Sequence, residues 1–570
     1  MKTKLMNIAI AAVMLLGMGS CKLDYFPSDE LNSDLLLQDA KGAEYIMDGC
    51  YAIMKDEVEF LGYSSGNTYA RHYFQLSEFP GDNICLSAHT IDPLYEATAY
   101  MMNDGLKNVG TLWMIGYKII YMTNTVISTL DESDANNKQL LGEAYFMRGL
   151  MHLQMVTLFA KPYSMGRDNI GVPLRTTTAS DKIVRNPVGE VYDQIVADLK
   201  KAAELMGASR GNAGYPSHDA ALGVLSRVYL YMDDYDNCIA TVDEMLAGAD
   251  PSSKLESTGG FATYFANAKT SKETLFCIAH EVSDDCGQSS IGSMYLKDGI
   301  GWGEVYPSDP LMYLYERYPD DVRYSSFIIP QFSDNNDMRV YVTIPATDDD
   351  PEAPHIKQRF NLIDDGAGNY SFKDGSTTYN IEKRKINGEG KQDAAGEYVE
   401  YHVNFKGEDC LCRINHDVTL RTGFTIPMVF VNKFSYQDGN PMLSSPVLCR
   451  WGEVILNRAE AYAKSGQDAK ALADVNVIRT RAGIPAEGMF AAGNMHGYDN
   501  VLDVVLDERR MELAFEGHRM FDVYRNKRDM DRRYAGAQPF KIVPYTEPHI
   551  QYPIPNNEWT VSGIEQNPGY

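Results

Sequence analysis

Apolar residues recur at helical spacing in several long segments of the chain. In residues 111–130 they include Trp113, Tyr117, Ile120 and Ile127, which fall three or four positions apart. Residues 140–159 repeat this pattern and stop before Pro162, whose ring cannot continue a helix. Because such spacing gathers apolar side chains on one face, we predict amphipathic helices here and at residues 39–54.

Two further segments each predict an antiparallel pair of helices. In residues 217–247 two apolar-faced stretches are separated by the acidic turn at 233–236, and residues 450–482 hold a second pair. Gly466 stands where the first helix of that second pair should end in a left-handed residue. Both pairs are of the tetratricopeptide kind, but no strict repeat of about 34 residues connects them. We therefore expect a helical scaffold with long insertions and not a regular solenoid.

The insertions carry strand and turn signals. Residues 330–412 contain the turn sequences DDG at 364–366 and NG at 387–388, and residues 398–405 alternate between apolar and polar. This pattern predicts surface hairpins. Residues 256–310 are rich in glycine and aromatic residues, which predicts loops between helical parts.

The N-terminus has the pattern of a secretory signal. Lys2 and Lys4 precede an apolar run at 8–16, and small residues follow it up to Cys21. The run is shorter than the roughly 20 residues that span a bilayer, and no later segment is apolar enough to do so. We predict a lipoprotein signal peptide at 1–20, a lipid on Cys21 and a tether at 21–35. The alternative is ordinary secretion with Cys21 unmodified.

Composition and charge exclude several classes of protein. Apolar residues make up 44% and charged residues 23%, which is typical of a globular chain. Asp and Glu number 78 against 52 Lys and Arg, a net charge of −26. Such a charge repels phosphate, so we expect no nucleic-acid binding and no docking on anionic lipid through basic residues. The eight other cysteines lack metal-site spacing, so we expect free thiols, no metal and no cofactor. Residues 348–350 are expected to be a solvated acidic turn and not an ion site.

The most charge-dense segment is expected to be structural. Glu508, Glu512 and Glu516 fall four apart on one helical face. The two carboxylates of a glycosidase must instead face each other across a substrate, about 5–9.5 Å apart. We expect ion pairing with the interleaved arginines at 509, 510 and 519. The motifs GxSxG, HExxH, GxxxxGK[ST] and GxGxxG are absent, so no enzyme is predicted.

Aromatic residues in loops are the candidates for ligand binding, because sugar rings stack on aromatic faces. Trp113 and Trp451 lie within helical patterns and are expected in the core. Trp302 stands in the glycine-rich loop 299–304 and is the predicted ligand platform, the alternative being a loop anchor packed on the scaffold. The other candidate ligand-binding residues are Tyr306, Tyr295, Arg71, Tyr73, His89 and Tyr95.

Several motifs, in this order along the chain, resemble the SusD/RagB family of outer-membrane nutrient-binding lipoproteins. They are CKLD at 21–24, EAYFMRG at 143–149, NVIRTRAG at 476–483, ERRMELAFEGHR at 508–519 and QNPGY at 566–570. The resemblance implies a mainly α, SusD-like fold, in which tetratricopeptide-like helix pairs support a loop-rich, irregular ligand face with a few short hairpins. It divides the mature chain into an N-terminal helical part at 36–255, insertions with the ligand face at 256–415, and a C-terminal helical part at 416–570.

The same resemblance implies a function without chemistry. Members of this family bind oligosaccharides, or peptides in some branches, and deliver them to a SusC-like, TonB-dependent transporter. It implies a protein anchored in the outer membrane through Cys21 on the extracellular face, with ligand contacts in regions 71–100 and 290–310. The sequence departs from the family pattern in its export signal. Surface lipoproteins often carry several acidic residues just after the lipidated cysteine, whereas here only Asp24 lies close to Cys21. The open alternatives are peptide capture in the same cavity, a glycosidase with carboxylates in the loops, and a structural subunit that closes the transporter.

Overall fold

The computed structural model divides the chain into two compact units, Met1–Tyr45 and Ile46–Tyr570, and all contacts reported below lie within the second. The described residues are 41–56, 68–87, 90, 95–179, 182–296, 299–330, 338–344, 357–385, 391–392, 398–419, 425–426, 429–534, 536–539 and 541–570. The predicted signal peptide at 1–20, the tether at 21–35 with Cys21, the candidate His89 and the acidic turn at 348–350 lie outside them.

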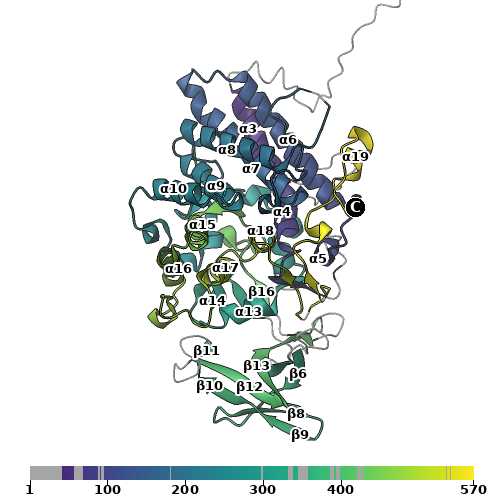
Figure 1. The fold of residues 1–570 in the computed structure, drawn as a ribbon, viewed down its shortest axis with the longest axis vertical. Helices are drawn as coiled ribbons and strands as arrows, with labels where there is room; N and C mark the ends of the chain where they lie inside the picture. The colour runs from purple at the N-terminus through teal and green to yellow at the C-terminus, as the bar shows by residue number, and fades with distance from the viewer. Residues whose placement is uncertain are drawn as a thin grey trace, which may run out of the picture. The chain divides into compact units, whose positions relative to one another are not determined.

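Helices from the first half of the chain pack side by side (Figure 1). Helix α7 lies between α6 and α8, and α8 also packs on α9. The two predicted long helices are confirmed, although α6 begins four residues earlier than its pattern indicates. The helices of this half are α3 (Gly42–Ile53), α4 (Tyr69–Glu78), α5 (Tyr95–Ala99), α6 (Lys107–Thr129), α7 (Lys138–Phe159), α8 (Val188–Leu205), α9 (His218–Tyr231) and α10 (Tyr235–Leu246).

Both predicted helix pairs are confirmed. Helices α9 and α10 form the first pair, each beginning at a side-chain cap from Ser217 or Asp234. Helices α15 (Trp451–Lys464) and α16 (Asp468–Arg481) form the second, and Gly466 has the expected left-handed φ of +71°. Because α15 packs against α9 and α10, the N-terminal and C-terminal helical parts share one core. The remaining long elements of the C-terminal part are α17 (Val501–Glu512), α18 (Arg519–Arg525) and α19 (Asn556–Ser562).

The predicted hairpins are confirmed, and they join into one antiparallel sheet. Its strand order is β10-β12-β13-β5-β6, with β11 paired to β12, and the strands β7-β8-β9 form a three-stranded sheet beside it. Val340, Phe372 and Phe405 are among the side chains that form a separate apolar core here. The strands are β5 (Met338–Thr343), β6 (Lys357–Asn361), β7 (Ile363–Asp364), β8 (Tyr370–Asp374), β9 (Thr377–Asn380), β10 (Glu382–Lys385), β11 (Lys391–Gln392), β12 (Tyr398–Phe405) and β13 (Glu408–His416).

Short two-stranded ladders tie together segments that are far apart in the sequence. They are β1 (Ile84–Leu86) with β3 (Val305–Pro307), β2 (Thr274–Cys277) with β17 (Val447–Arg450), β4 (Ile328–Pro330) with β16 (Val429–Val431), β14 (Val418–Thr419) with β15 (Thr425–Ile426), and β18 (Met530–Asp531) with β19 (Ile542–Val543). Between them lie the short helices α11 (Thr258–Phe261), α12 (Gly292–Tyr295), α13 (Asp309–Tyr315) and α14 (Val322–Ser325). None of the described helices is both long and apolar enough to cross a bilayer.

The glutamates of the charge-dense segment are buried and ion-paired, as predicted, but with other partners. Glu508 pairs with Arg323 and Arg479, and Glu516 pairs with Arg450. Arg509 and Arg510 point elsewhere, because each step along a helix turns the side chain by about 100°. Arg519 is not on the same helix, since α17 ends at Glu512 and Arg519 begins α18. These arginines bind other carboxylates: Arg509 binds Asp522, while Arg510 and Arg519 both bind Asp82.

The cysteines are confirmed as free thiols. All eight in the described residues are unpaired, and all but the half-buried Cys286 are buried.

Candidate ligand-binding site

Strands β1 and β3 bring together the two regions in which ligand contacts are predicted. Cys85 lies opposite Tyr306 in this antiparallel ladder. The ladder extends through the backbone N–H of Ser87, which donates to the carbonyl oxygen of Glu304 at 2.8 Å. The Thr90 hydroxyl donates to the Glu304 carboxylate at 2.6 Å. Regions 71–100 and 290–310 therefore adjoin in the fold.

Trp302 lies in the loop between α12 and β3 with its ring partly in solvent. Its side chain is 45% exposed, and its Nε1 donates to the carbonyl oxygen of Gln288 at 3.1 Å. Gln288 in turn donates through Nε2 to the carbonyl oxygen of Ile300 at 3.3 Å. These two bonds hold the indole by its edge, so the residue is anchored in its loop while part of the ring stays accessible.

Two glycines allow the loops around Trp302 to pack closely. A Cβ atom at Gly301 would collide with the carbonyl oxygen of Ser293. One at Gly292, the first residue of α12, would collide with the carbonyl oxygen of Phe434. Segment 434–446 is thereby held against α12, and it supplies one wall of a hollow.

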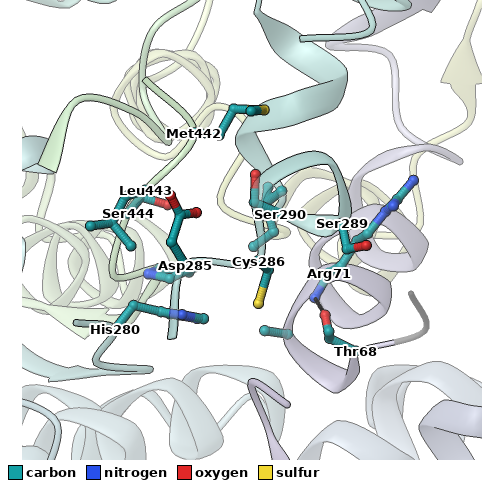
Figure 2. A pocket seen from close by; sticks show the side chains of 13 residues that line it. Thr68, Arg71, His280, Asp285, Cys286, Ser289, Ser290, Met442, Leu443 and Ser444 are labelled. Atoms are coloured by element: carbon teal, nitrogen blue, oxygen red, sulfur yellow. Dashed lines mark hydrogen bonds between the residues drawn. The ribbon is translucent and has the colours of Figure 1, made fainter. Parts of the chain in front are cut away.

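The hollow is small, with a volume of about 20 Å³ (Figure 2). Ser289, which follows the residue that binds the indole Nε1, is part of its lining. In Figure 2, His280, Asp285 and Ser444 lie on one side, while Thr68 and Arg71, at the start of α4, lie on the other. The lining offers a guanidinium, a carboxylate, an imidazole and several hydroxyls, which suits a ligand rich in hydrogen-bonding groups.

A charged cluster supports the floor of this hollow. Lys55 forms an ion pair with Asp284 and donates to the carbonyl oxygen of Ala279 at 2.9 Å. His280 Nδ1 lies 3.6 Å from the Asp284 carboxylate. Burial alone would raise the pKa of Asp284, but the hydrogen bonds from His280 and Lys55 outweigh it and hold that pKa well below its usual value. Asp284 is therefore a fixed anion that orients the His280 segment.

The described residues contain no group of three His, Cys, Asp or Glu side chains that could hold a metal ion. The Cys286 thiol, which lines the hollow, donates to the carbonyl oxygen of Lys55 at 3.3 Å. The lining of the hollow thus consists largely of hydrogen-bonding groups.

Three of the other predicted ligand residues are corrected to core positions. Tyr295, Tyr306 and Tyr73 are only 2%, 3% and 6% exposed. Tyr295 packs on Phe434 and Phe515 with ring centroids 5.7 and 5.6 Å apart. Their loops are aromatic-rich as the sequence shows, but the short elements α12, β3 and α4 turn these rings inward, where no face is left for a sugar to stack on.

Two further candidates, Arg71 and Tyr95, are partly exposed. Arg71 lines the hollow, and its Nε donates to Gln75 at 3.3 Å. Tyr95 is partly exposed, and its hydroxyl donates to the carbonyl oxygen of Ala537 at 3.1 Å. Trp113 and Trp451 are buried, as predicted.

The sequence patterns missed His280, Asp285, Ser289 and segment 442–446, all of which line the hollow. The only local signals are the turn residues in 436–446, including Gly439 and two prolines, which predict a loop but not its partner.

Comparisons with known proteins cover nearly all of this architecture. The family model described as "SusD family" matches residues 272–570, and one described as "Starch-binding associating with outer membrane" matches residues 45–230. A SusD-like protein P2 of Formosa agariphila is 23% identical over 503 residues, which cover 83% of each chain.

Solved structures share the fold at low sequence identity. A SusD superfamily protein from Bacteroides thetaiotaomicron superposes with a TM-score of 0.68 at 21% identity, covering 93% of this chain and 99% of the other. A SusD-like carbohydrate-binding protein from Bacteroides vulgatus gives 0.63 at 17% identity, covering 91% and 96%. A laminarin-binding SusD-like protein gives 0.58 at 18% identity, covering 93% and 100%. With one family model spanning more than half of its length and a mainly α fold of the same kind, the chain belongs to the SusD family.

Proposed function

We propose that this protein binds an oligosaccharide on the surface made by Trp302 and the adjoining hollow. The observation that carries the proposal is the indole of Trp302, which is held at its edge, partly exposed, and next to a hollow lined by hydrogen-bonding groups. A sugar ring can stack on the indole while its hydroxyls bond to side chains such as Arg71 and Asp285. The relatives described as carbohydrate-binding and laminarin-binding support this choice of ligand.

The proposed role is capture without catalysis. The three glutamates with the spacing of a carboxylate cluster are buried in ion pairs with arginines. The relatives named for an activity are named as binding proteins. We infer that the ligand leaves chemically unchanged and passes to a SusC-like, TonB-dependent transporter in the outer membrane.

Trp302→Ala should weaken glycan binding by about tenfold, the loss expected when one stacking ring is removed. Isothermal titration with a panel of polysaccharides, laminarin among them, measures this. Trp559→Ala is the matched control, because Trp559 is similarly exposed at 38% and is held by a hydrogen bond from its Nε1 to Asp104, away from the hollow. The control should bind like the wild type.

Other outcomes of the same experiment would replace the proposal. Unchanged affinity in a folded Trp302→Ala protein would remove Trp302 from the site. Binding to a peptide mixture and not to sugars would favour peptide capture in the same hollow. Shortened oligosaccharides after incubation with the protein would reveal a glycosidase. No measurable binding of either sugars or peptides would favour a subunit that only closes the transporter.

We propose further that a lipid on Cys21 anchors the protein in the outer membrane, at the extracellular face. Cys21→Ser should abolish labelling by radioactive palmitate and move the protein from the membrane fraction to the soluble fraction. Cys286→Ser is the control, since this half-buried thiol lies within the folded body. A wild-type protein that takes up no label would instead indicate secretion with Cys21 unmodified.

A further inference from the structure

A second, larger groove lies on the other side of the His280 segment. It is formed by the loop after α8, by residues 253–254 and 269–275, and by Trp451 at the start of α15, and its volume is about 940 Å³. Lys269 lines this groove and donates to the carbonyl oxygen of His280 at 3.4 Å, whereas the His280 side chain lines the hollow. We call it the basic groove, and it is separate from the hollow beside Trp302.

The lining of the basic groove has the opposite charge from the rest of the protein. It contains Lys254, Lys269 and Lys272 but only one acidic residue, Asp219. Across the chain, acids outnumber Lys and Arg by 78 to 52. Lysines therefore outnumber carboxylates along this lining, in a molecule of strongly negative net charge.

Two of these lysines lack a carboxylate partner. Lys269 forms an ion pair with Glu281 at 2.7 Å. Lys254 instead places its ammonium 4.9 Å from the centroid of the Trp451 ring, and Lys272 donates to the carbonyl oxygen of Ser253 at 3.2 Å. Among the residues that the structure describes, neither Lys254 nor Lys272 pairs with a carboxylate. Within the described residues, therefore, no ion pair neutralises these two charges on the wall of the groove.

The bond from Lys272 reaches the residue that precedes Lys254, so both lysines lie on the same part of the groove wall. An anion bound in the groove would be attracted by both charges. An oxyanion can also accept charge-assisted hydrogen bonds from both ammonium groups, which are stronger than neutral ones.

The rest of the lining favours a hydroxyl-rich ligand over a peptide. Asn212, Ser217 and Thr270 bring amide and hydroxyl groups to the groove. Its larger apolar side chains are buried and leave no open apolar pocket for a peptide side chain; these are Met206, Leu275 and Trp451.

We propose that the basic groove binds an anionic glycan through Lys254 and Lys272, which contact its sulfate or carboxylate groups. The proposal rests on the proposed function, since it adds an anion-selective site to a glycan-binding protein. It predicts a preference for charged over neutral forms of one saccharide, and an affinity that falls as salt is added.

The test compares matched ligand pairs on the purified protein by isothermal titration. One pair is a sulfated carrageenan oligosaccharide with its desulfated form, and the other is an oligogalacturonate with its carboxyl-reduced form. The double variant Lys254→Met and Lys272→Met removes both charges. The substitution at position 254 keeps an aliphatic side chain over the Trp451 ring. The double variant should bind the preferred anionic ligand at least tenfold more weakly than the wild type, because two charge-assisted contacts are lost.

Lys470→Met is the control, because the Lys470 ammonium also lies over an aromatic ring, 5.1 Å from the centroid of Tyr462, but outside the groove. It should bind like the wild type. Equal binding of charged and neutral partners, or unchanged affinity in the double variant, would overturn the proposal. Binding of an acidic peptide such as oligoglutamate through these lysines, with no binding of either glycan, would also overturn the proposal.

Failure here is distinguishable from failure of the proposed function. Neutral glycan binding that depends on Trp302 but not on the lysines would keep the proposed function and reject the basic groove. Sulfate-only or carboxylate-only selectivity would support the groove and identify the anion.

Discussion

Glu78 is the last residue of α4, and its carboxylate is fully buried. It accepts hydrogen bonds from Asn83 Nδ2 and from the backbone N–H of Gly517, both at 3.0 Å. These bonds and the charge of Lys433 favour the ionised form, but burial is the larger effect and raises the pKa of Glu78 to about 7. A single residue thus titrates near neutral pH inside the scaffold.

Glu78→Gln should change how stability depends on pH. The folded pKa is raised, from a usual value of 4.5 to about 7. The folded protein therefore binds more protons than the unfolded chain in this window, and wild-type stability falls as pH rises through it. The free energy of unfolding of the wild type, minus that of the variant, should drop by about 3 kcal/mol between pH 4.5 and pH 8. Urea unfolding at several pH values measures this difference.

Glu190→Gln is the control for that measurement. Its exposed carboxylate also accepts a hydrogen bond from an asparagine, Asn186, at 2.9 Å. Because this carboxylate is exposed, the variant should lack the burial-dependent drop expected for Glu78→Gln. If the stability difference between wild type and Glu78→Gln also does not change with pH, then the Glu78 carboxylate is ionised throughout this pH range.

At the scale of elements, the sequence patterns predict the helices well because helical periodicity is local. The end of α7 before Pro162, the pair α9 and α10, and the left-handed Gly466 all follow from residues within one or two turns. Strand β12 has the bounds of its alternating pattern, Tyr398–Phe405. These signals are enough to predict a helical scaffold with hairpin insertions.

The candidate site depends on contacts that no local pattern contains. Strands β1 and β3 have three residues each, too few to show a period, and they pair across more than 200 positions of the sequence. The hollow needs segments near 70, 285 and 443 to meet. The exposure of Trp302 could be predicted from its glycine-rich loop, whereas Tyr295 and Tyr306 could not be placed in the core, because their burial depends on these distant partners.

At the scale of the whole molecule, a buried network of charges joins segments that lie far apart in the chain, from Glu273 to Glu516. Arg450, at the end of β17, pairs with Glu273 at 3.1 Å and with Glu516 at 2.8 Å. Burial alone would raise the pKa of Glu516, but the charges of Arg450 and Lys433 lower it to about 2. Breaking a buried pair leaves an uncompensated charge, which is far costlier than breaking an exposed one.

Glu512→Gln should therefore destabilise the protein by about 3–5 kcal/mol at pH 7, measured by urea unfolding. Glu512 pairs with Arg450, Arg481 and Arg323, and these arginines hold its pKa below the usual 4.5 despite burial. A lowered pKa stabilises the fold above pH 4.5, and this contribution is lost as pH falls, so the gap between wild type and variant should narrow in acid. Asp193→Asn, which breaks the exposed pair with Arg167, should cost less than about 1 kcal/mol. Equal losses in the two variants would show that the network adds nothing beyond a surface ion pair.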